Sequence, residues 1–276
     1  MHKTRSKTLC DDFIIKAKYT WKLIKLSGSW GMSLLEETIT DTNLLDLQVK
    51  HPHEISTLKF PKYQEAKVGA DWEWWLGSED FWLPLRVQAK IVDSTTLRYS
   101  HLGYKNPKSP QRQIEILIKH SLNENPPKIP VYVFYNYWDI SKFNPPWLCP
   151  TYPKSVEMLG CGVSEAISVK TILDQGSDKL IDIANIMYPW SCLICCKGFS
   201  AENGKLPFRA FDFCLGAYRK RIRETNFASY EREKFVRKGA PSYVYKILKG
   251  EKLSEDEWSK IEVNRITVTQ EKGYEN

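Results

Sequence analysis

Apolar residues recur at helical spacing in the first part of the chain. Residues 12–27 (DFIIKAKYTWKLIKLS) repeat apolar groups every three or four positions with lysines between them, which predicts an amphipathic helix. A second helix is expected to start at Ser33, which has Glu36 three residues later as in a capping box, and to end at His51 and Pro52. The chain is therefore expected to open with two helices.

The pattern then changes to that of strands. EAKVGADWEWWLG and FWLPLRVQAKIV, within residues 63–93, are joined by the short polar SED, and such a pair of runs predicts an antiparallel hairpin. The helix QRQIEILIKHSL, which would start after Ser109 and Pro110, and the buried strand IPVYVFYNYW follow. The order helix, hairpin, helix, strand is typical of an α/β core.

The second half of the chain is less regular. CGVSEAISVKTIL and KLIDIANIM are interpreted as helical or mixed, PWSCLICC as a short buried strand, and PFRAFDFCLGAYRKRI as an amphipathic helix with a basic end. Two short helices, PSYVYKIL and SEDEWSKI, are expected near the end, the second with Ser254 and Glu257 at capping-box spacing. Without a repeat or a low-complexity linker, we expect one compact unit. Its parts would be a basic helical extension (1–32), an α/β core (33–140) and an α/β and helical completion (141–276).

Composition places the chain among globular proteins. Its 276 residues are 42% hydrophobic and 13% aromatic, which is enough to bury a sizeable core. The sequence has neither an apolar signal segment nor a run approaching the roughly 20 apolar residues that span a bilayer, so we expect a cytoplasmic protein without a membrane partner. Seven cysteines, an odd number, suit a reducing compartment in which thiols are buried apolar groups, and no disulfide is expected.

The chain is moderately basic, with a formal net charge of +7. Positive residues gather in KTRSK near the start, in YRKRIR (218–223) and in EREKFVRK (231–238). Such clusters fit a polyanionic partner such as nucleic acid. Solvated helix faces that only keep the protein soluble fit equally well, because acids are interleaved in the last cluster.

The predicted hairpin gathers polar side chains among its tryptophans. Alternate residues of a strand point to opposite faces, so the first two tryptophans of DWEWW would enter the core while Asp71 and Glu73 share the other face. In the second strand, VQAK places Gln88 and Lys90 on one face. If both strands bury their apolar faces together, the four polar side chains meet across the hairpin.

These residue types suit metal-assisted phosphodiester hydrolysis. Carboxylate and amide oxygens are hard ligands for Mg²⁺ or Mn²⁺. A lysine such as Lys90 can prepare the attacking water and offset the charge that develops on the phosphate oxygens. From spacing alone, an edge hairpin whose polar residues face water and form weak cross-strand ion pairs is the more common arrangement.

A resemblance adds weight to the catalytic interpretation. GADWEWW followed by LRVQAK resembles the D…(D/E/Q)-x-K core of the restriction-endonuclease-like PD-(D/E)XK superfamily, in the Q-x-K variant of Mrr-like members. Together with EETITDTNLL, RQIEILI, VYVFYN and PWSCLICC, it also resembles a bacterial family of unknown function with a GADWEWW signature, found in genomes with anti-phage islands. The resemblance covers most of the chain from about residue 33. It implies an α/β fold with a restriction-endonuclease-like mixed sheet flanked by helices, and additional C-terminal helices.

The resemblance also assigns roles to individual residues. It implies that Asp71 is the metal-binding acid, that Gln88 occupies the usual position of a second acid, and that Lys90 is the catalytic lysine. Glu37 would be the metal-binding acid of the preceding helix, and Gln113 a group on the next helix that faces the substrate. Gln88 departs from the commonest pattern, because a neutral amide is a weaker ligand for a hard cation. Glu73, on the same predicted face as Asp71, could restore the missing charge.

The resulting expectation is a nuclease that depends on Mg²⁺ or Mn²⁺ and acts in bacterial anti-phage defence, with DNA favoured over RNA as its substrate. The alternative is a catalytically inactive subunit of the same fold that binds nucleic acid or a partner protein. Convergence of Asp71, Gln88 and Lys90 with Glu37 in one pocket would favour the enzyme.

Two further groups of residues are weaker candidates. Tyr99, His101 and Lys105, in the loop RYSHLGYK, would contact a scissile phosphate if this loop borders the site, although an ordinary polar connection is the commoner case. The sequence contains no HExxH, P-loop, GxGxxG or GxSxG motif, which excludes the hydrolase, NTPase and dinucleotide-binding classes that these motifs mark.

PWSCLICC carries a C-x-x-C spacing that could bind zinc. Cys192, Cys195 and Cys196 would provide ligands, and Cys161 and Cys214 could complete a set of four. Apolar flanks and the lack of a second C-x-x-C favour buried structural thiols over a zinc site.

Overall fold

A mixed eight-stranded sheet forms the centre of the protein. The computed structural model describes residues 7–60, 68–105, 111–197, 204–219 and 231–271. The strand order is β1-β8-β2-β3-β4-β5-β6, and β7 pairs with β3. Two neighbouring pairs, β2–β8 and β3–β4, are parallel and the other pairs are antiparallel. The strands are β1 (Ile55–Lys59), β2 (Trp72–Ser78), β3 (Phe81–Ile91), β4 (Ile129–Tyr135), β5 (Cys161–Glu165), β6 (Tyr188–Pro189), β7 (Arg237–Lys238) and β8 (Arg265–Glu271).

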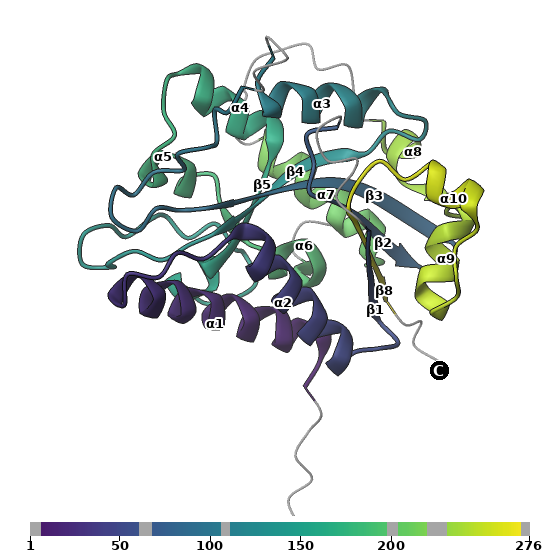
Figure 1. Cartoon of the computed structure of the whole chain (residues 1–276), viewed down its shortest axis with the longest axis horizontal. Coiled ribbons are helices and arrows are strands. Elements are labelled where there is room, and N and C mark those ends of the chain that lie inside the picture. Colours follow the sequence, from purple (N-terminus) through teal and green to yellow (C-terminus); the bar gives the residue numbers. More distant parts are fainter. Residues whose placement is uncertain (1–6, 61–67, 106–110, 198–203, 220–230, 272–276) are drawn as a thin grey trace, which may run out of the picture.

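Helices cover both faces of this sheet (Figure 1). One face packs against α1, α2, α6 and α7, and the other against α3, α4, α5 and α9. The predicted fold class, a mixed α/β sheet flanked by helices with further helices near the C-terminus, is therefore confirmed. The helices are α1 (Leu9–Ser29), α2 (Glu36–Lys50), α3 (Gln113–Asn123), η1 (Val156–Gly160), α4 (Ala166–Asp174), α5 (Leu180–Ala184), α6 (Ser191–Cys195), α7 (Leu206–Arg219), α8 (Arg232–Phe235), α9 (Ser242–Lys249) and α10 (Glu255–Ser259). Within the described ranges, no helix is both long and apolar enough to cross a membrane.

The predicted hairpin is confirmed as β2 and β3, with Trp72 opposite Val87. Trp72 and Trp74 enter the core layer beneath α1, as the alternation predicts. The opposite face of β2 is also covered, because Trp75 lies in the second core layer and all of β2 is buried. A strand in the middle of a sheet that helices cover on both sides has no face left for solvent.

Some local predictions are wrong. The second helix begins at Glu36 rather than after Ser33, and its N-cap residue makes no side-chain hydrogen bond. PWSCLICC is the end of β6 followed by the helix α6, not a strand. A short apolar run does not distinguish a buried strand from a buried helical turn. Ser109 and Pro110 lie outside the described residues, and the capping residue of α3 is Arg112.

The first helix is packed into the core. Phe13 is completely buried, stacks on Trp74 and meets Trp190 edge-on, with ring centroids 6.0 and 4.8 Å apart. The Trp190 indole donates a hydrogen bond of 2.8 Å to the carbonyl of Phe13. α1 therefore contributes to the same hydrophobic layer as the hairpin.

Contrary to expectation, the chain contains a disulfide. Cys10 in α1 is bonded to Cys195 in α6. The prediction that every cysteine is a free thiol is therefore wrong. Spacing along the sequence could not reveal this pair, because its members are 185 residues apart.

Gly160, the last residue of η1, allows α1 to pack closely against this segment. A Cβ at this position would lie 2.7 Å from the backbone nitrogen of Trp21 and in contact with the carbonyl of Ala17. We expect Gly160→Ala to lower the free energy of unfolding by about 1–3 kcal/mol, because the backbone of α1 must shift. Chemical denaturation measures this change. Gly103→Ala is the matched control, since an added Cβ there meets nothing within 4 Å, and equal effects of the two substitutions would contradict the close-approach argument.

Candidate active site

A cavity lies where β3 continues past the start of its neighbour β2. β2 begins at Trp72, opposite Val87, whereas β3 extends to Ile91. The cavity has a volume of about 230 Å³. Its lining residues come from α2, the start of β2, β3, α3 and the start of β8: Glu36, Glu37, Thr40, Asp71, Gln88, Ala89, Lys90, Gln113, Asn264 and Arg265.

Two carboxylates occupy the edge of β3 where β2 is absent. Asp71 donates its backbone N–H to the Val87 carbonyl at 2.8 Å and accepts the N–H of Ala89 on Oδ2 at 2.6 Å. Glu36 accepts the N–H of Ile91 on Oε1 at 3.3 Å. Backbone N–H groups left by a missing strand need such partners. The fold therefore holds two acids beside the part of β3 that carries Gln88 and Lys90.

Four side chains form a continuous hydrogen-bonded chain across the cavity. Lys90 Nζ donates to Gln113 Oε1 at 3.2 Å, Gln113 Nε2 donates to Gln88 Oε1 at 2.9 Å, and Gln88 Nε2 donates to Asp71 Oδ2 at 2.6 Å. Every bond has the same direction, from the ammonium toward the carboxylate. Gln88 is 3% exposed and Lys90 7% exposed. The structure thus brings together Asp71, Gln88, Lys90 and Gln113, as the sequence and the resemblance predict, while their roles stay predictions.

Tyr132 in β4 is a neighbour that the sequence analysis missed. It pairs with Gln88 in the parallel register of β3 and β4. Its buried hydroxyl has no hydrogen-bond partner within the part of the chain that the structure describes. Burial, and then the negative charge of Asp71, raise the pKa of Tyr132. The motif VYVFYN gave no sign that Tyr132 lies beside the site, because a tyrosine in a buried strand is usually part of the core.

Two adjacent acids of α2 border the cavity, and they differ in their contacts. Glu37, the acid chosen from the sequence, lines the cavity and forms an ion pair of 2.9 Å with Lys59. Glu36 lines the cavity and also binds the edge of β3. Glu36 is therefore a further candidate that sequence reasoning missed, because that reasoning placed the start of the helix too early.

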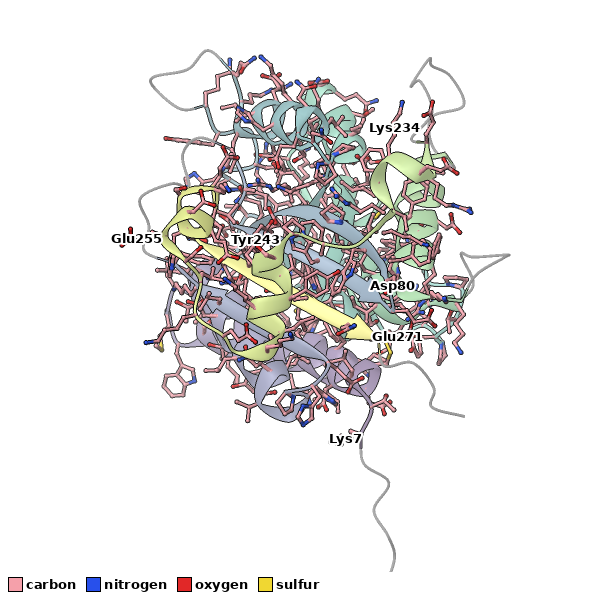
Figure 2. The ribbon with its side chains drawn as sticks, turned by 90° about the vertical axis from the view of Figure 1, so that its right-hand side faces the viewer. Lys7, Asp80, Lys234, Tyr243, Glu255 and Glu271 are labelled. Carbon is pink, nitrogen blue, oxygen red and sulfur yellow. A yellow bond between two sulfur atoms is a disulfide. The ribbon has the colours of Figure 1, made fainter. Side chains whose placement is uncertain are left out.

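Glu73 does not line the cavity, so its predicted place beside Asp71 in the site is wrong. Its carboxylate lies 2.8 Å from Lys128 Nζ and 3.4 Å from Arg86 Nε, and it accepts the Tyr243 hydroxyl at 2.6 Å. Tyr243 comes from α9, which lies over the sheet in Figure 2. Burial raises the pKa of Glu73, but Lys128 and Arg86 outweigh burial and lower the pKa to about 2.

The predicted loop contacts are placed differently from one another. Tyr99 is 1% exposed and donates its hydroxyl to Asn136 Oδ1 at 2.6 Å, and burial raises its pKa. Its hydroxyl therefore holds the loop against the residue that follows β4, and Tyr99 also lines the neighbouring cavity. Lys105 is exposed and lines neither this cavity nor the one beside it. His101 lines the neighbouring cavity.

That neighbouring cavity is larger, about 470 Å³, and shares Glu36 and Lys90 with the first. Its other polar lining residues come from the end of α1, the segment that follows it and the loop after β3: Ser27, Ser33, Asp93, Ser94, Thr95, Tyr99, Ser100 and His101. The two cavities therefore meet at Lys90. Together they provide a polar groove on either side of the lysine.

Residues 9–275 match the sequence model of one protein family, described as a family of unknown function (DUF6615). The chain belongs to DUF6615. The matched region contains all the elements that line both cavities. A comparison with curated proteins found no match.

The basic clusters of this DUF6615 protein are only partly visible. Residues 3–6 and 220–223 lie outside the described residues. In the cluster 231–238, Lys234 pairs with Glu231 at 2.9 Å and Arg232 pairs with Asp212 at 3.2 Å. These contacts favour a solvated, ion-paired face for this last cluster.

The oxygen donors of the cavity are of the chemical type that hard divalent cations prefer. Asp71, Glu36 and Glu37 offer carboxylates, and Gln88 offers an amide oxygen. As the residues lie, Gln88 turns its nitrogen toward Asp71. A cation held by both residues therefore requires the amide to turn, so that Oε1 faces Asp71.

Proposed function

We propose that the protein is a nuclease that hydrolyses phosphodiester bonds with the help of Mg²⁺ or Mn²⁺, and that DNA is its substrate. The observation that carries this proposal is the convergence of Asp71, Gln88 and Lys90 with two helix acids in one cavity. The elements follow one another as the acidic helix α2, β1, β2 directly after Asp71, β3 with Q-x-K, α3 and β4, and this succession supports the resemblance to the PD-(D/E)XK pattern. From the same resemblance we propose a role in bacterial anti-phage defence, inside the cytoplasm.

Asp71, Gln88 and one or both acids of α2 would hold the cation. When bound, a divalent cation stabilises the negative charge that develops during attack on a phosphodiester. Asp71 is well suited to this role because its backbone and Oδ2 are fixed on β3 by hydrogen bonds. A ligand that is already oriented loses little entropy when it binds.

Lys90 would act on the phosphate. Its ammonium is buried in the floor where the two cavities meet, and its described partner is the neutral amide of Gln113 rather than a carboxylate. A positive charge in a water-poor site stabilises developing negative charge more strongly than it would in water. Lys90 can also orient the attacking water by donating a hydrogen bond. Gln113 is then a positioning residue for Lys90.

The one-way direction of the hydrogen-bonded chain links the orientation of the Gln88 amide to the hydrogen bond of Lys90. Each glutamine amide has an acceptor on one side and a donor on the other. If Gln88 turns its oxygen toward Asp71, its nitrogen faces Gln113, which must turn its own oxygen to accept. The nitrogen of Gln113 then faces Lys90, and the ammonium loses its acceptor. In that orientation Lys90 would be free to donate to a phosphate oxygen.

A second candidate function is a catalytically inactive subunit that binds nucleic acid or a partner protein. The observation that favours it is the neutral Gln88, which satisfies Asp71 by donating a hydrogen bond, without a cation. Such a protein would bind nucleic acid without cleaving it, and its binding would not depend on Lys90.

The experiment that separates the two functions is incubation of the purified full chain with plasmid, linear duplex DNA, single-stranded DNA and RNA. Each substrate is tested with Mg²⁺, with Mn²⁺ and with a chelator. The proposal expects cleavage of at least one substrate, DNA first, in the presence of metal only. Retarded but intact substrate in every condition would favour the binding subunit.

A change at position 88 tests the proposed metal ligand. We expect Gln88→Glu to lower the metal concentration needed for half-maximal cleavage by roughly tenfold or more. Two opposite unit charges about 4 Å apart attract each other by about 1 kcal/mol in bulk water and by about 4 kcal/mol near a protein surface. The measurement is the initial rate against Mn²⁺ concentration. Without metal, repulsion between Asp71 and the new carboxylate should lower the melting temperature, and Mn²⁺ should restore it.

Gln111→Glu is the matched control, because it adds the same charge at an exposed position that lines neither cavity. Its metal requirement should equal that of the wild type. An unchanged requirement in Gln88→Glu as well would show that position 88 does not contribute to a cation site.

A further inference from the structure

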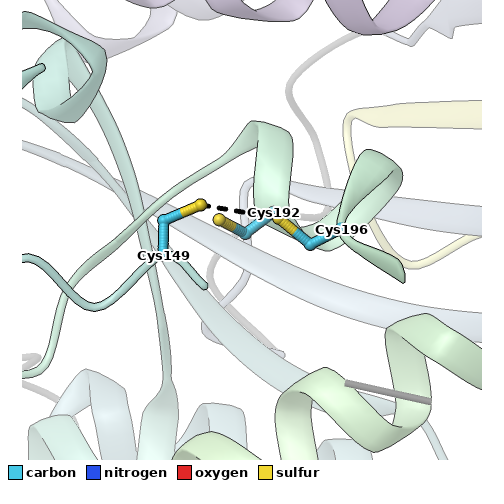
Figure 3. A group of neighbouring side chains, drawn as sticks. All are labelled: Cys149, Cys192 and Cys196. Carbon is cyan, nitrogen blue, oxygen red and sulfur yellow. Dashed lines mark hydrogen bonds between the residues drawn. The ribbon is translucent and has the colours of Figure 1, made fainter. Parts of the chain in front are cut away.

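Three buried cysteines meet on the opposite side of the sheet from Gln88 and Lys90. The ligand atoms of Cys149, Cys192 and Cys196 all lie within 4.8 Å of one another. Figure 3 shows the three side chains converging from two separate segments, the loop after β4 and the helix α6. Each is at most 6% exposed. None of them lines either cavity described above.

Of the zinc ligands considered from the sequence, Cys192 and Cys196 belong to this cluster, and its third member, Cys149, was not among them. Cys195 is bonded to Cys10. Cys161 lies elsewhere, within hydrogen-bonding distance of Thr20 and Asn43. The spacing that matters is Cys192 to Cys196, one helical turn, and the third member comes from 47 residues before Cys196. The sequence run CLICC therefore sends its sulfur atoms in two directions, one toward α1 and two toward the loop at Cys149.

The distances suit a metal ion bound by thiolates. A tetrahedral zinc ion with Zn–S bonds of about 2.3 Å holds its sulfur ligands about 3.8 Å apart. The Sγ atoms of Cys149 and Cys196 are 3.6 Å apart. The backbone N–H of Tyr152 also donates to Cys149 Sγ at 3.3 Å, and such an outer hydrogen bond orients a metal ligand.

The chemistry of the site selects the class of metal. Thiolates are soft ligands, which prefer zinc or cuprous ions to the hard Mg²⁺ and Mn²⁺ that suit the carboxylates of the other site. Zinc is usually tetrahedral in structural sites, and it has no redox chemistry. A zinc ion here would join the loop after β4 to α6.

We propose that Cys149, Cys192 and Cys196 form a zinc site, with an exogenous ligand in the fourth position, that stabilises the packing of the loop on α6. Binding converts the three thiols to thiolates and releases their protons, so acid should weaken occupancy. The site is independent of the nuclease proposal.

The test is the zinc content of the full chain, expressed with zinc and purified without chelator. We expect elemental mass spectrometry to find one zinc ion per chain. When Co²⁺ replaces the zinc, we expect the absorption bands of Co²⁺ in tetrahedral thiolate coordination. Cys149→Ser should lose the metal and the bands. Cys214→Ser, which alters a buried cysteine outside the cluster, should keep both.

A second measurement uses only the wild-type protein, so it does not require any variant to fold. Zinc should protect the three thiols of the wild-type protein from alkylation, and a chelator should expose them and lower the melting temperature. The proposal would be overturned if the wild-type protein took up neither zinc nor Co²⁺. It would also be overturned if the Cys149→Ser variant kept the metal. Zinc-free protein in which Cys149 and Cys196 form a disulfide would also overturn the proposal, because these residues could then not serve as thiolate ligands.

Discussion

Lys90→Ala should lower the rate of cleavage by roughly 10²–10⁴-fold, the usual cost of removing a group that stabilises charge or transfers a proton in the transition state. The melting temperature should stay close to that of the wild type, because Lys90 makes one described side-chain hydrogen bond, to a neutral amide. Initial rates on the substrate identified from the panel, beside thermal unfolding, measure both properties. A large loss of activity with little loss of stability would assign Lys90 to chemistry rather than to folding.

Lys105→Ala is the matched control for this prediction. Lys105 is exposed and lines neither cavity, so its removal should leave the rate essentially unchanged. If the two alanine variants cleave equally well, Lys90 does not act on the phosphate, and the role inferred from Q-x-K fails.

Glu73→Ala should lower the free energy of unfolding by about 3–5 kcal/mol, because removing one member of a buried ion pair leaves the other charges uncompensated. Arg86 and Lys128 are both buried and both lie against Glu73. Urea denaturation measures the change. Asp256→Asn is the control, since its ion pair with Lys260 is mostly exposed and should contribute less than about 1 kcal/mol.

The same cluster gives the protein a defined response to acid. The pKa of Glu73 is lowered from 4.5 to about 2 in the folded protein, so the unfolded chain binds the proton first. The stabilisation from Glu73 is therefore fully present above pH 4.5 and is lost as the pH falls toward 2. Glu73→Gln should lose less stability than the wild type over this range, and parallel stability profiles would contradict the assigned ion pairs.

The hairpin and its polar residues could be predicted because their signal is local. Alternation places Asp71, Gln88 and Lys90 on one face, and the antiparallel register then makes Asp71 and Gln88 neighbours. Gln113 followed from the resemblance, and the structure places it between Gln88 and Lys90. These contacts need only a strand period of two and one helix that crosses the same face.

Glu73 shows where such reasoning stops. Alternation identifies the face on which a side chain lies, but not what covers that face. At Glu73, α9 supplies Tyr243, and Lys128 comes from the segment between α3 and β4. Of two acidic residues two positions apart, Asp71 therefore lines the cavity, whereas Glu73 belongs to a structural ion-pair cluster.

Long-range partners account for the other omissions. β8 enters the sheet between β1 and β2 from the far end of the chain, and it brings Arg265 to the cavity wall. Cys149 lies beside Cys196, although the two are 47 residues apart in the sequence. No periodicity within one segment reveals such pairs, because tertiary packing decides them.

The most direct test of the proposed active site is the cleavage of DNA by the wild type and by Asp71→Ala in Mg²⁺, after addition of chelator, and after restoring excess Mg²⁺. The account predicts that the wild type cleaves, stops with chelator and resumes with metal, while Asp71→Ala is inactive throughout at a temperature at which thermal unfolding shows that it is folded. Cleavage by the wild type in chelator, or undiminished cleavage by Asp71→Ala, would contradict it. A wild type that cleaves neither DNA nor RNA in any metal would favour the binding subunit instead.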